Sequence, residues 1–142
     1  MSQRYGALKV VVYSDDSTVR SSIVNALGRQ IATDLPEHEI HEFATGPAMR
    51  LYLDRHKVDC IILDGEATPE GGLGIARQLK DEIFECPPVL VLVARADDAW
   101  LGAWSRADSV LSHPIDPFTF AQSVAELLRS HLSHISHISH RA

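Results

Sequence analysis

The stretch VDCIILDGEATPEGG, residues 58–72, decides how this sequence folds. Its first half is an almost continuous apolar run, which is typical of a strand buried on both faces of a parallel sheet. The run ends at Asp64, and the glycine and proline residues that follow indicate a turn. A charged carboxylate is unusual at the end of a buried strand. The rest of the sequence has to explain its position.

Apolar strands and amphipathic helices alternate on both sides of this stretch. Apolar runs or two-residue alternation predict strands, and apolar residues spaced by three and four predict helices. The expected strands are 8–13, 38–43, 58–64, 87–94 and 108–112, and the helices are expected within 14–31, 46–56, 73–83, 97–106 and 116–128. This alternation predicts an α/β fold, with a doubly wound five-stranded parallel sheet and helices on both faces.

The carboxyl ends of these strands are expected to meet at one edge of the sheet. In doubly wound sheets the working site lies beyond these ends, near the point where the strand order reverses. This rule brings together Ser14, Asp15, Asp16, Asp64 and Val93. Asp64 is therefore expected where chemistry would occur.

The composition is that of a single globular domain. The 142 residues are 45% hydrophobic and 23% charged, which fits a chain that buries a core. The net charge of −6 and the scattered basic residues count against DNA binding. No apolar segment reaches the roughly 20 residues of a membrane span. The sequence also has no signal peptide, so we expect a cytoplasmic protein that makes no membrane contact.

The last residues, 130–142, differ from the domain that we assign to residues 1–129. They repeat a Ser-His-apolar unit with a period of three, which places histidines at 131, 134, 137 and 140. This period matches neither a helix nor a strand, so the histidines do not share one face. We expect this His/Ser-rich segment to be disordered.

Four motifs between Lys9 and Pro114 stand in an order that indicates a family. They are KVVVYSDDSTVR, DCIILD followed by Gly72 and Leu73, PPVLVLVA and ADSVLSHP. Each motif alone is weak, but together they resemble the receiver domain of two-component response regulators, the fold of the chemotaxis response regulator. The resemblance implies a flavodoxin-like (βα)5 fold.

The resemblance also implies a function for Asp64. A receiver aspartate accepts a phosphoryl group from a phosphohistidine of a histidine kinase or phosphotransfer protein. By resemblance, Asp64 is the phosphoacceptor, and Asp15, Asp64 and the backbone carbonyl of Glu66 bind Mg²⁺. Asp16 and Ser14 are further candidate metal ligands.

The acidic turn after the first strand departs from the family pattern. In the ungapped alignment, Ser14 and Asp15 take the places of two adjacent acids, which predicts a weakened Mg²⁺ site. A shift of one residue would restore a pair, Asp15 and Asp16, but would require a gap before Arg20. The ungapped alignment is preferred, and the other stays open.

Three further positions lack the usual groups for reading out phosphorylation. Val93 stands where a Thr or Ser hydroxyl binds the phosphoryl group, and such a hydrogen bond is worth about 1.5–3 kcal/mol. His113 stands at the usual Lys, and Val110 replaces the aromatic residue whose inward turn reports phosphorylation. We therefore expect a receiver with its acceptor retained and its read-out altered.

Two groups of residues are candidates for contacts outside this chemistry. Trp100 and Trp104 lie four apart on a short helix, and tryptophan is enriched at binding hot spots. The expected partner surface consists of Trp100, Leu101, Trp104, Val110 and Ile115. Receivers often pair through their fourth and fifth helices, so the resemblance also allows a homodimer. Glu66 and Arg95 are candidates for an ion pair across the mouth of the site.

The leading hypothesis is a stand-alone, atypical receiver that is phosphorylated on Asp64 and signals to a downstream protein by contact. The first alternative is a pseudo-receiver that binds partners without phosphorylation. Under the leading hypothesis, the protein is expected to catalyse at most its own phosphorylation from a phosphodonor and a slow autodephosphorylation. A second alternative is a haloacid-dehalogenase-like phosphatase, because ILDGEAT approaches the Asp-x-Asp-x-Thr signature of that family.

Overall fold

The computed structural model describes residues 6–95, 98 and 100–141, with side chains described as far as residue 135. Five parallel strands form one sheet of order β2-β1-β3-β4-β5, which confirms the predicted fold class. The strands are β1 (Leu8–Tyr13), β2 (His38–Phe43), β3 (Cys60–Asp64), β4 (Val89–Val93) and β5 (Ser109–Ser112). The helices are α2 (Ser17–Leu27), α3 (Gly46–Arg55), α4 (Gly72–Glu82), α5 (Trp100–Ser105) and α6 (Pro117–Arg141).

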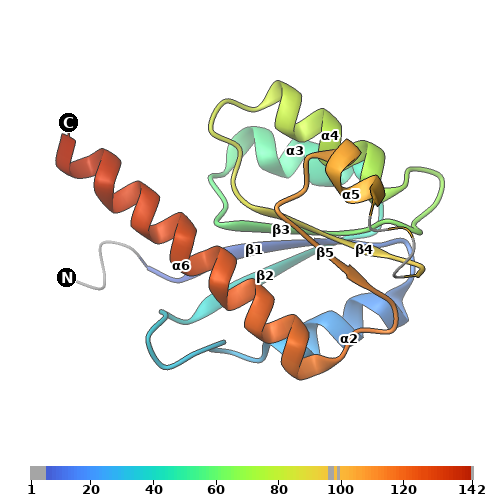
Figure 1. Ribbon diagram of the computed structural model, residues 1–142, viewed down its shortest axis with the longest axis horizontal. Coiled ribbons are helices and arrows are strands. Elements are labelled where there is room, and N and C mark those ends of the chain that lie inside the picture. Colours follow the sequence, from blue (N-terminus) through green and yellow to red (C-terminus); the bar gives the residue numbers. More distant parts are fainter. Residues whose placement is uncertain (1–5, 96–97, 99, 142) are drawn as a thin grey trace.

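The helices cover the sheet in two layers, as Figure 1 shows. Helices α3, α4 and α5 lie over one face, and α2 and α6 lie over the other. The chain starts at β1, goes to one edge at β2, and returns past β1 to β3. The strand order therefore reverses between β1 and β3, and the residues just after β1 and at the end of β3 meet there.

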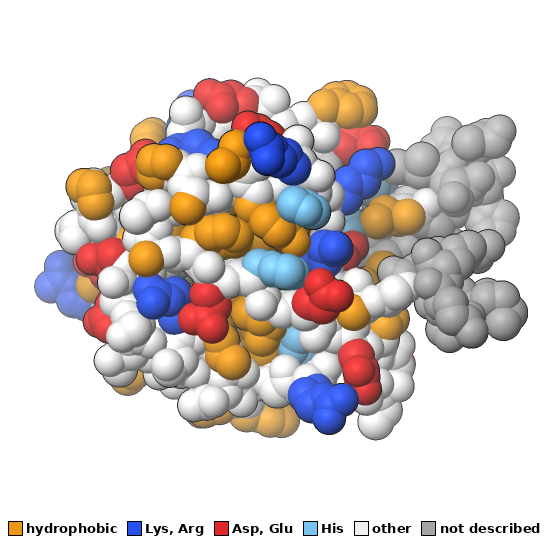
Figure 2. Space-filling view, turned by 180° about the vertical axis from the view of Figure 1, so that it is seen from behind, with side chains coloured by type: hydrophobic (Ala, Val, Ile, Leu, Met, Phe, Trp, Pro, Cys, Tyr) orange, Lys and Arg blue, Asp and Glu red, His pale blue; other side chains and the backbone are white. Residues whose placement is uncertain are grey.

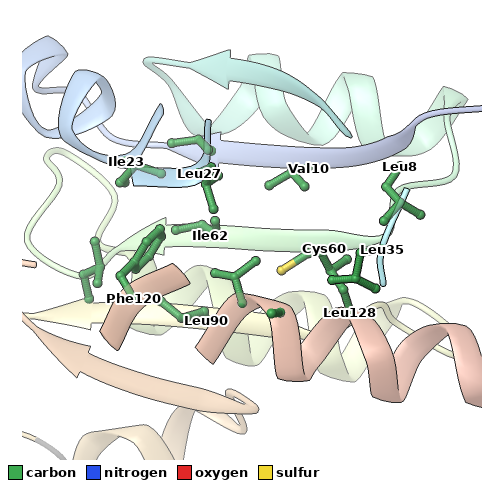
Figure 3. Close-up of a cluster of buried hydrophobic side chains, with 14 residues drawn as sticks. Leu8, Val10, Ile23, Leu27, Leu35, Cys60, Ile62, Leu90, Phe120 and Leu128 are labelled. Atoms are coloured by element: carbon green, nitrogen blue, oxygen red, sulfur yellow. The ribbon is translucent and has the colours of Figure 1, made fainter. Parts of the chain in front are cut away.

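Each central strand contributes to two hydrophobic cores because its side chains alternate between the faces. Val10, Val12 and Ile62 face α2 and α6, where Phe120 and Leu128 also lie (Figure 3). The intervening residues of the same strands face α3, α4 and α5. All residues of β3 and β4 are buried, as expected for parallel strands between two helical layers.

Polar residues fix where the helices begin. The side chain of Asp16 caps α2 by accepting a hydrogen bond from the backbone N–H of Thr18 at 2.8 Å. The hydroxyl of Thr45 caps α3 in the same way through Ala48, and Pro47 occupies the first turn. These caps set the position of the loops that precede α2 and α3, beside the carboxyl ends of the strands.

Helix α6 differs from the sequence prediction, which placed a disordered segment from residue 130 onward. The helix continues to Arg141 and projects beyond the sheet in Figure 1. Arg129 forms two hydrogen bonds with Asp34, at 2.7 and 2.9 Å, and Nε2 of His131 lies 3.0 Å from Oδ1 of Asp59. These contacts, and the packing of Leu132 against the core, favour helix for a segment whose own pattern is weak.

Gly72 and Gly74 of α4 provide a matched test of how closely this helix packs on β3. A Cβ atom at Gly72 would lie 2.8 Å from the carbonyl oxygen of Asp64, whereas a Cβ at Gly74 would meet nothing within 4 Å. We expect Gly72→Ala to lower the free energy of unfolding by about 1–3 kcal/mol, because α4 must shift. Gly74→Ala should raise it by up to about 1 kcal/mol, because alanine favours helix. Chemical denaturation measures both, and equal effects would contradict the packing.

Candidate functional site

Asp64, the last residue of β3, is 3% exposed, and its carboxylate has a partner from each of three segments. Oδ1 accepts a hydrogen bond from the backbone N–H of Glu66 at 2.9 Å and lies 2.9 Å from Nε2 of His113. Oδ2 accepts a hydrogen bond from the hydroxyl of Ser14 at 2.7 Å. A buried charge without such partners would be costly. These contacts explain how a buried strand can end in a carboxylate.

Ser14 follows β1 directly and is fully buried. Its hydroxyl oxygen also accepts a hydrogen bond from the N–H of Asp16 at 3.0 Å, and its carbonyl accepts one from Arg20. In this geometry Ser14 stands beside Asp64, and Asp15 is the next residue outward. Asp16 is engaged as the cap of α2.

Val93 and His113 bound the site on the side of β4 and β5. Val93 is the last residue of β4 and is 1% exposed, and its side chain has no hydrogen-bond donor. Its carbonyl accepts a hydrogen bond from the backbone N–H of His113 at 2.8 Å. This bond holds the imidazole of His113 next to Asp64. Of the two, only His113 can contact a group bound to Asp64 through a polar side-chain atom.

Four acidic residues line one open hollow of about 420 Å³ at the carboxyl ends of the strands. The lining residues are Asp15, Asp16, Val19, Asp64, Glu66, Ala94 and His113. No three His, Cys, Asp or Glu side chains among the described residues approach closely enough to form a metal cage. The donor type nevertheless fits Mg²⁺, which is bound through oxygen, needs only one or two carboxylates and keeps several waters.

The β3–α4 loop, residues 65–71, closes the acidic side of the hollow. Thr68 donates two hydrogen bonds to Asp15, one from its backbone N–H at 3.2 Å and one from its hydroxyl at 3.0 Å. Oε2 of Glu66 accepts a hydrogen bond from the N–H of Ala94 at 3.2 Å. The ion pair expected between Glu66 and Arg95 is not among the contacts of the described residues.

Glu70, at the far end of this loop, connects it to α3 and β1. The carboxylate of Glu70 accepts two hydrogen bonds from Nη1 of Arg50, at 3.1 and 3.0 Å. Its carbonyl accepts one from the hydroxyl of Tyr13 at 2.6 Å. Burial, with Glu70 and Asp15 as weaker causes, raises the pKa of Tyr13. The hydroxyl therefore remains a donor over a wider pH range.

Sequence reasoning did not identify Tyr13, Arg50, Thr68 and Glu70 as parts of the site. Thr68 is the threonine of the ILDGEAT stretch, which the sequence linked only to the phosphatase alternative. The one available signal for Tyr13 was its position at the carboxyl end of a buried strand, where a polar ring atom requires a partner.

The predicted partner surface is divided between the two faces of the protein. Trp100 and Trp104 of α5 are 70% and 48% exposed, and Val110 packs beneath Gly102 of the same helix. Leu101 is also part of α5. Ile115 is partly buried against the core on the side of α2 and α6, beyond the edge strand β5, and its place in a surface with the tryptophans stays a prediction.

Trp104 is partly covered by α4. The guanidinium carbon of Arg77 lies 5.1 Å from the centre of a Trp104 ring, and its Nη1 donates a hydrogen bond to the Trp104 carbonyl at 2.9 Å. Trp100 is thus the more accessible of the two rings.

Comparison with known proteins identifies relatives along most of the chain. The sequence is 50% identical over 124 residues to uncharacterised response regulatory proteins from two strains of Mycobacterium tuberculosis, CDC 1551 and H37Rv. Each match covers 87% of this chain and 93% of the relative. No family model matches the chain.

Solved structures with this fold are also receiver domains. The signal receiver domain of a putative LuxO repressor from Vibrio parahaemolyticus aligns with a TM-score of 0.74 and 20% identity, over 90% of this chain and 95% of that one. The chemotaxis response regulator CheY4 of Vibrio cholerae aligns with a TM-score of 0.71 and 19% identity, over 86% and 99%. The Thermotoga maritima response regulator DrrB matches over 87% of this chain but only 54% of its own length, with a TM-score of 0.68 and 20% identity.

The close relatives and the site geometry lead to one assignment. The relatives match 87% of the chain at 50% identity, and the solved receiver domains align with its parallel α/β fold. The chain belongs to the response regulator family, and its fold is that of a receiver domain.

Proposed function

We propose that this receiver accepts a phosphoryl group on Asp64 from a histidine kinase or a phosphotransfer protein, and signals by contact with a downstream protein. The observation that supports this most is the position of the Asp64 carboxylate. It stands at the reversal of strand order and lines an open hollow, although only 3% of the residue is exposed. A carboxylate kept there by three partners is held in one orientation for attack.

The proposed step is a transfer between two phosphoryl carriers. A carboxylate oxygen of Asp64 forms a bond to phosphorus, while the P–N bond of the donor phosphohistidine breaks. The donor imidazole keeps the electron pair of that bond and takes a proton from water. Among the described residues, Oδ1 has two partners and Oδ2 has one, the Ser14 hydroxyl, so Oδ2 is the less crowded oxygen for attack on phosphorus.

Mg²⁺ is proposed as the cofactor, held by Asp15, Asp64 and the backbone carbonyl of Glu66. Four acidic residues around one hollow repel an incoming phosphoryl anion, and a bound divalent cation would offset that charge. Because Ser14 is uncharged where the family has an acid, the site has fewer carboxylates to offer. We therefore expect weak binding that leaves much of the Mg²⁺ hydration shell in place.

The distribution of charged side chains on the surface is consistent with binding to other proteins. Basic and acidic side chains are interspersed on the face shown in Figure 2, which does not present a continuous basic surface for DNA. Within the described residues, none of the helices has the length and apolar character to cross a bilayer. We propose that the chain meets its phosphodonor in the cytoplasm.

A pseudo-receiver is the second candidate, and one observation favours it. Both oxygens of Asp64 already accept hydrogen bonds, and Val93 offers no donor to a phosphoryl group, so the unmodified carboxylate is well accommodated. In that case Trp100 and its neighbours would bind a partner constitutively, and Asp64→Asn would leave this binding unchanged. The phosphatase alternative is not proposed, because the relatives belong to a different family.

Intact-protein mass spectrometry tests the acceptor directly. We expect wild type incubated with Mg²⁺ and acetyl phosphate to gain one phosphoryl group, and Asp64→Asn to gain none. Asp54→Asn is the matched control, because it makes the same change on the exposed side of α3, outside the lining of the hollow. The control should therefore retain the adduct. A folded wild type without an adduct would favour the pseudo-receiver.

Substitution of His113 tests the cationic contribution at the site. His113→Lys places a permanent positive charge near Asp64 and should accelerate adduct formation roughly three- to tenfold. His113→Gln keeps a hydrogen-bond donor but cannot be charged, and should react more slowly than wild type. A time course by mass spectrometry compares the three proteins. If the lysine variant is no faster than the glutamine variant, charge at this position does not assist the transfer.

A further inference from the structure

Arg20 of α2 connects the end of β2 to the turn that follows β1. Its Nη1 donates a hydrogen bond to the carbonyl of Ser14 at 2.6 Å, and its Nε donates one to Oε1 of Glu42 at 3.2 Å. The charged side chain of Arg20 is only 18% exposed. A guanidinium group presents its donors in a rigid fork, so two acceptors on different elements define its position. Arg20 is therefore a well-placed cation beside the turn that carries Ser14.

The carbonyl that Arg20 binds belongs to a fully buried residue. The backbone N–H of Ser14 donates a hydrogen bond to the carbonyl of Phe43 at 3.2 Å, so both polar groups of its backbone have partners. A buried carbonyl without a donor is costly, and the turn would have to move to give it another partner or water. Arg20 thus helps to fix the backbone of Ser14.

The backbone of Ser14 determines where its hydroxyl can lie. The side chain has a single heavy-atom torsion with three staggered positions, so a fixed backbone leaves few places for Oγ. Here Oγ lies 2.7 Å from Oδ2 of Asp64 and accepts a hydrogen bond from the N–H of Asp16 at 3.0 Å. A displacement of the Ser14 carbonyl would therefore move the hydroxyl relative to the Asp64 carboxylate.

We propose that Arg20 is a positioning residue for Asp64: by holding the carbonyl of Ser14, it keeps the Ser14 hydroxyl on Oδ2 and so fixes the orientation of the carboxylate. The described lining of the hollow does not include Arg20, so its effect passes through Ser14. The inference rests on the proposed function, because orientation of Asp64 matters for phosphoryl transfer. It adds a link from the acceptor to the end of β2 through Glu42.

The orientation of the carboxylate should appear in the rate of phosphoryl transfer. We expect Ser14→Ala and Arg20→Gln each to slow formation of the Asp64 adduct with acetyl phosphate about three- to tenfold, measured by a mass-spectrometric time course. Glutamine is shorter and uncharged, so it cannot bridge the same two partners. Arg29→Gln is the matched control, because Arg29 also lies near a glutamate, Glu37 at 4.0 Å, but its side chain is 90% exposed. Its rate should equal that of wild type.

A double-mutant cycle tests whether Arg20 acts through Ser14. In the Ser14→Ala protein the hydroxyl is already gone, so adding Arg20→Gln should cause no further loss of rate. If the two effects multiply, Arg20 acts on the site independently and the inference is overturned. A rate in either single variant that equals or exceeds the wild-type rate would overturn it as well, because the hydroxyl would then not assist orientation.

The amide signal of Asp16 reports the position of the Ser14 hydroxyl without any phosphorylation, because this N–H donates to Oγ of Ser14. In ¹H–¹⁵N NMR spectra, Arg20→Gln should shift the signal toward its position in Ser14→Ala. Arg29→Gln should leave it where it is in wild type. The dispersion of the same spectra shows that each variant is folded. An unshifted Asp16 signal in folded Arg20→Gln would contradict the inference.

Glu42→Gln provides a second variant in case Arg20→Gln does not fold. It weakens the attachment of Arg20 at β2 and keeps all of its donors. The Asp16 signal should then shift in the same direction as in Ser14→Ala, by a smaller amount. No shift in this variant would count against Arg20 as a positioning residue.

The outcomes separate this inference from the function on which it rests. An Asp64 adduct in wild type, combined with an unshifted Asp16 signal or with multiplying rate effects, would retain the acceptor and reject the role of Arg20. A shifted Asp16 signal without any adduct in wild type would retain the hold of Arg20 on Ser14 and reject the phosphoacceptor.

Discussion

A carboxylate that is withdrawn from water must be given hydrogen-bond donors, and three separate segments supply them to Asp64. Ser14 comes from the turn after β1, the N–H of Glu66 from the loop after β3, and His113 from the end of β5. Their meeting depends on the strand order, because β1 and β4 flank β3 and β5 lies beside β4. The chemistry at this edge of the sheet therefore depends on the strand order, which brings the three donors to one buried carboxylate.

The fold was readable from the sequence because its signals are local. The apolar runs of β1, β3 and β4 and the proline in the first turn of α3 each specify structure within a few residues. The helical end of α6 could not be predicted from local signals. Its period of three is poor for a helix, but the His131–Asp59 and Arg129–Asp34 contacts join residues that are 72 and 95 positions apart.

The residues of the site likewise fall into those that local sequence signals predict and those that depend on long-range contacts. Asp64, Val93 and the residues after β1 follow from the rule that strand ends meet at one edge, and the structure brings them together around one hollow and its border. The contact between Thr68 and Asp15 depends on the path of a loop, and nothing in the local pattern specifies that path. Tyr13 and Glu70 are 57 residues apart, and their hydrogen bond likewise becomes visible only in three dimensions.

The two edge strands of the sheet, β2 and β5, affect how readily the protein aggregates at high concentration. An unpaired edge strand is a template for a strand of another molecule, and charged side chains or short length make it a poor one. β5 has four residues, and β2 carries Glu39 and Glu42, paired with His41 and Arg20 respectively. A foreign strand would have to displace these pairs. The receiver can thus offer a helical surface to partners while its exposed backbone resists amyloid-like growth.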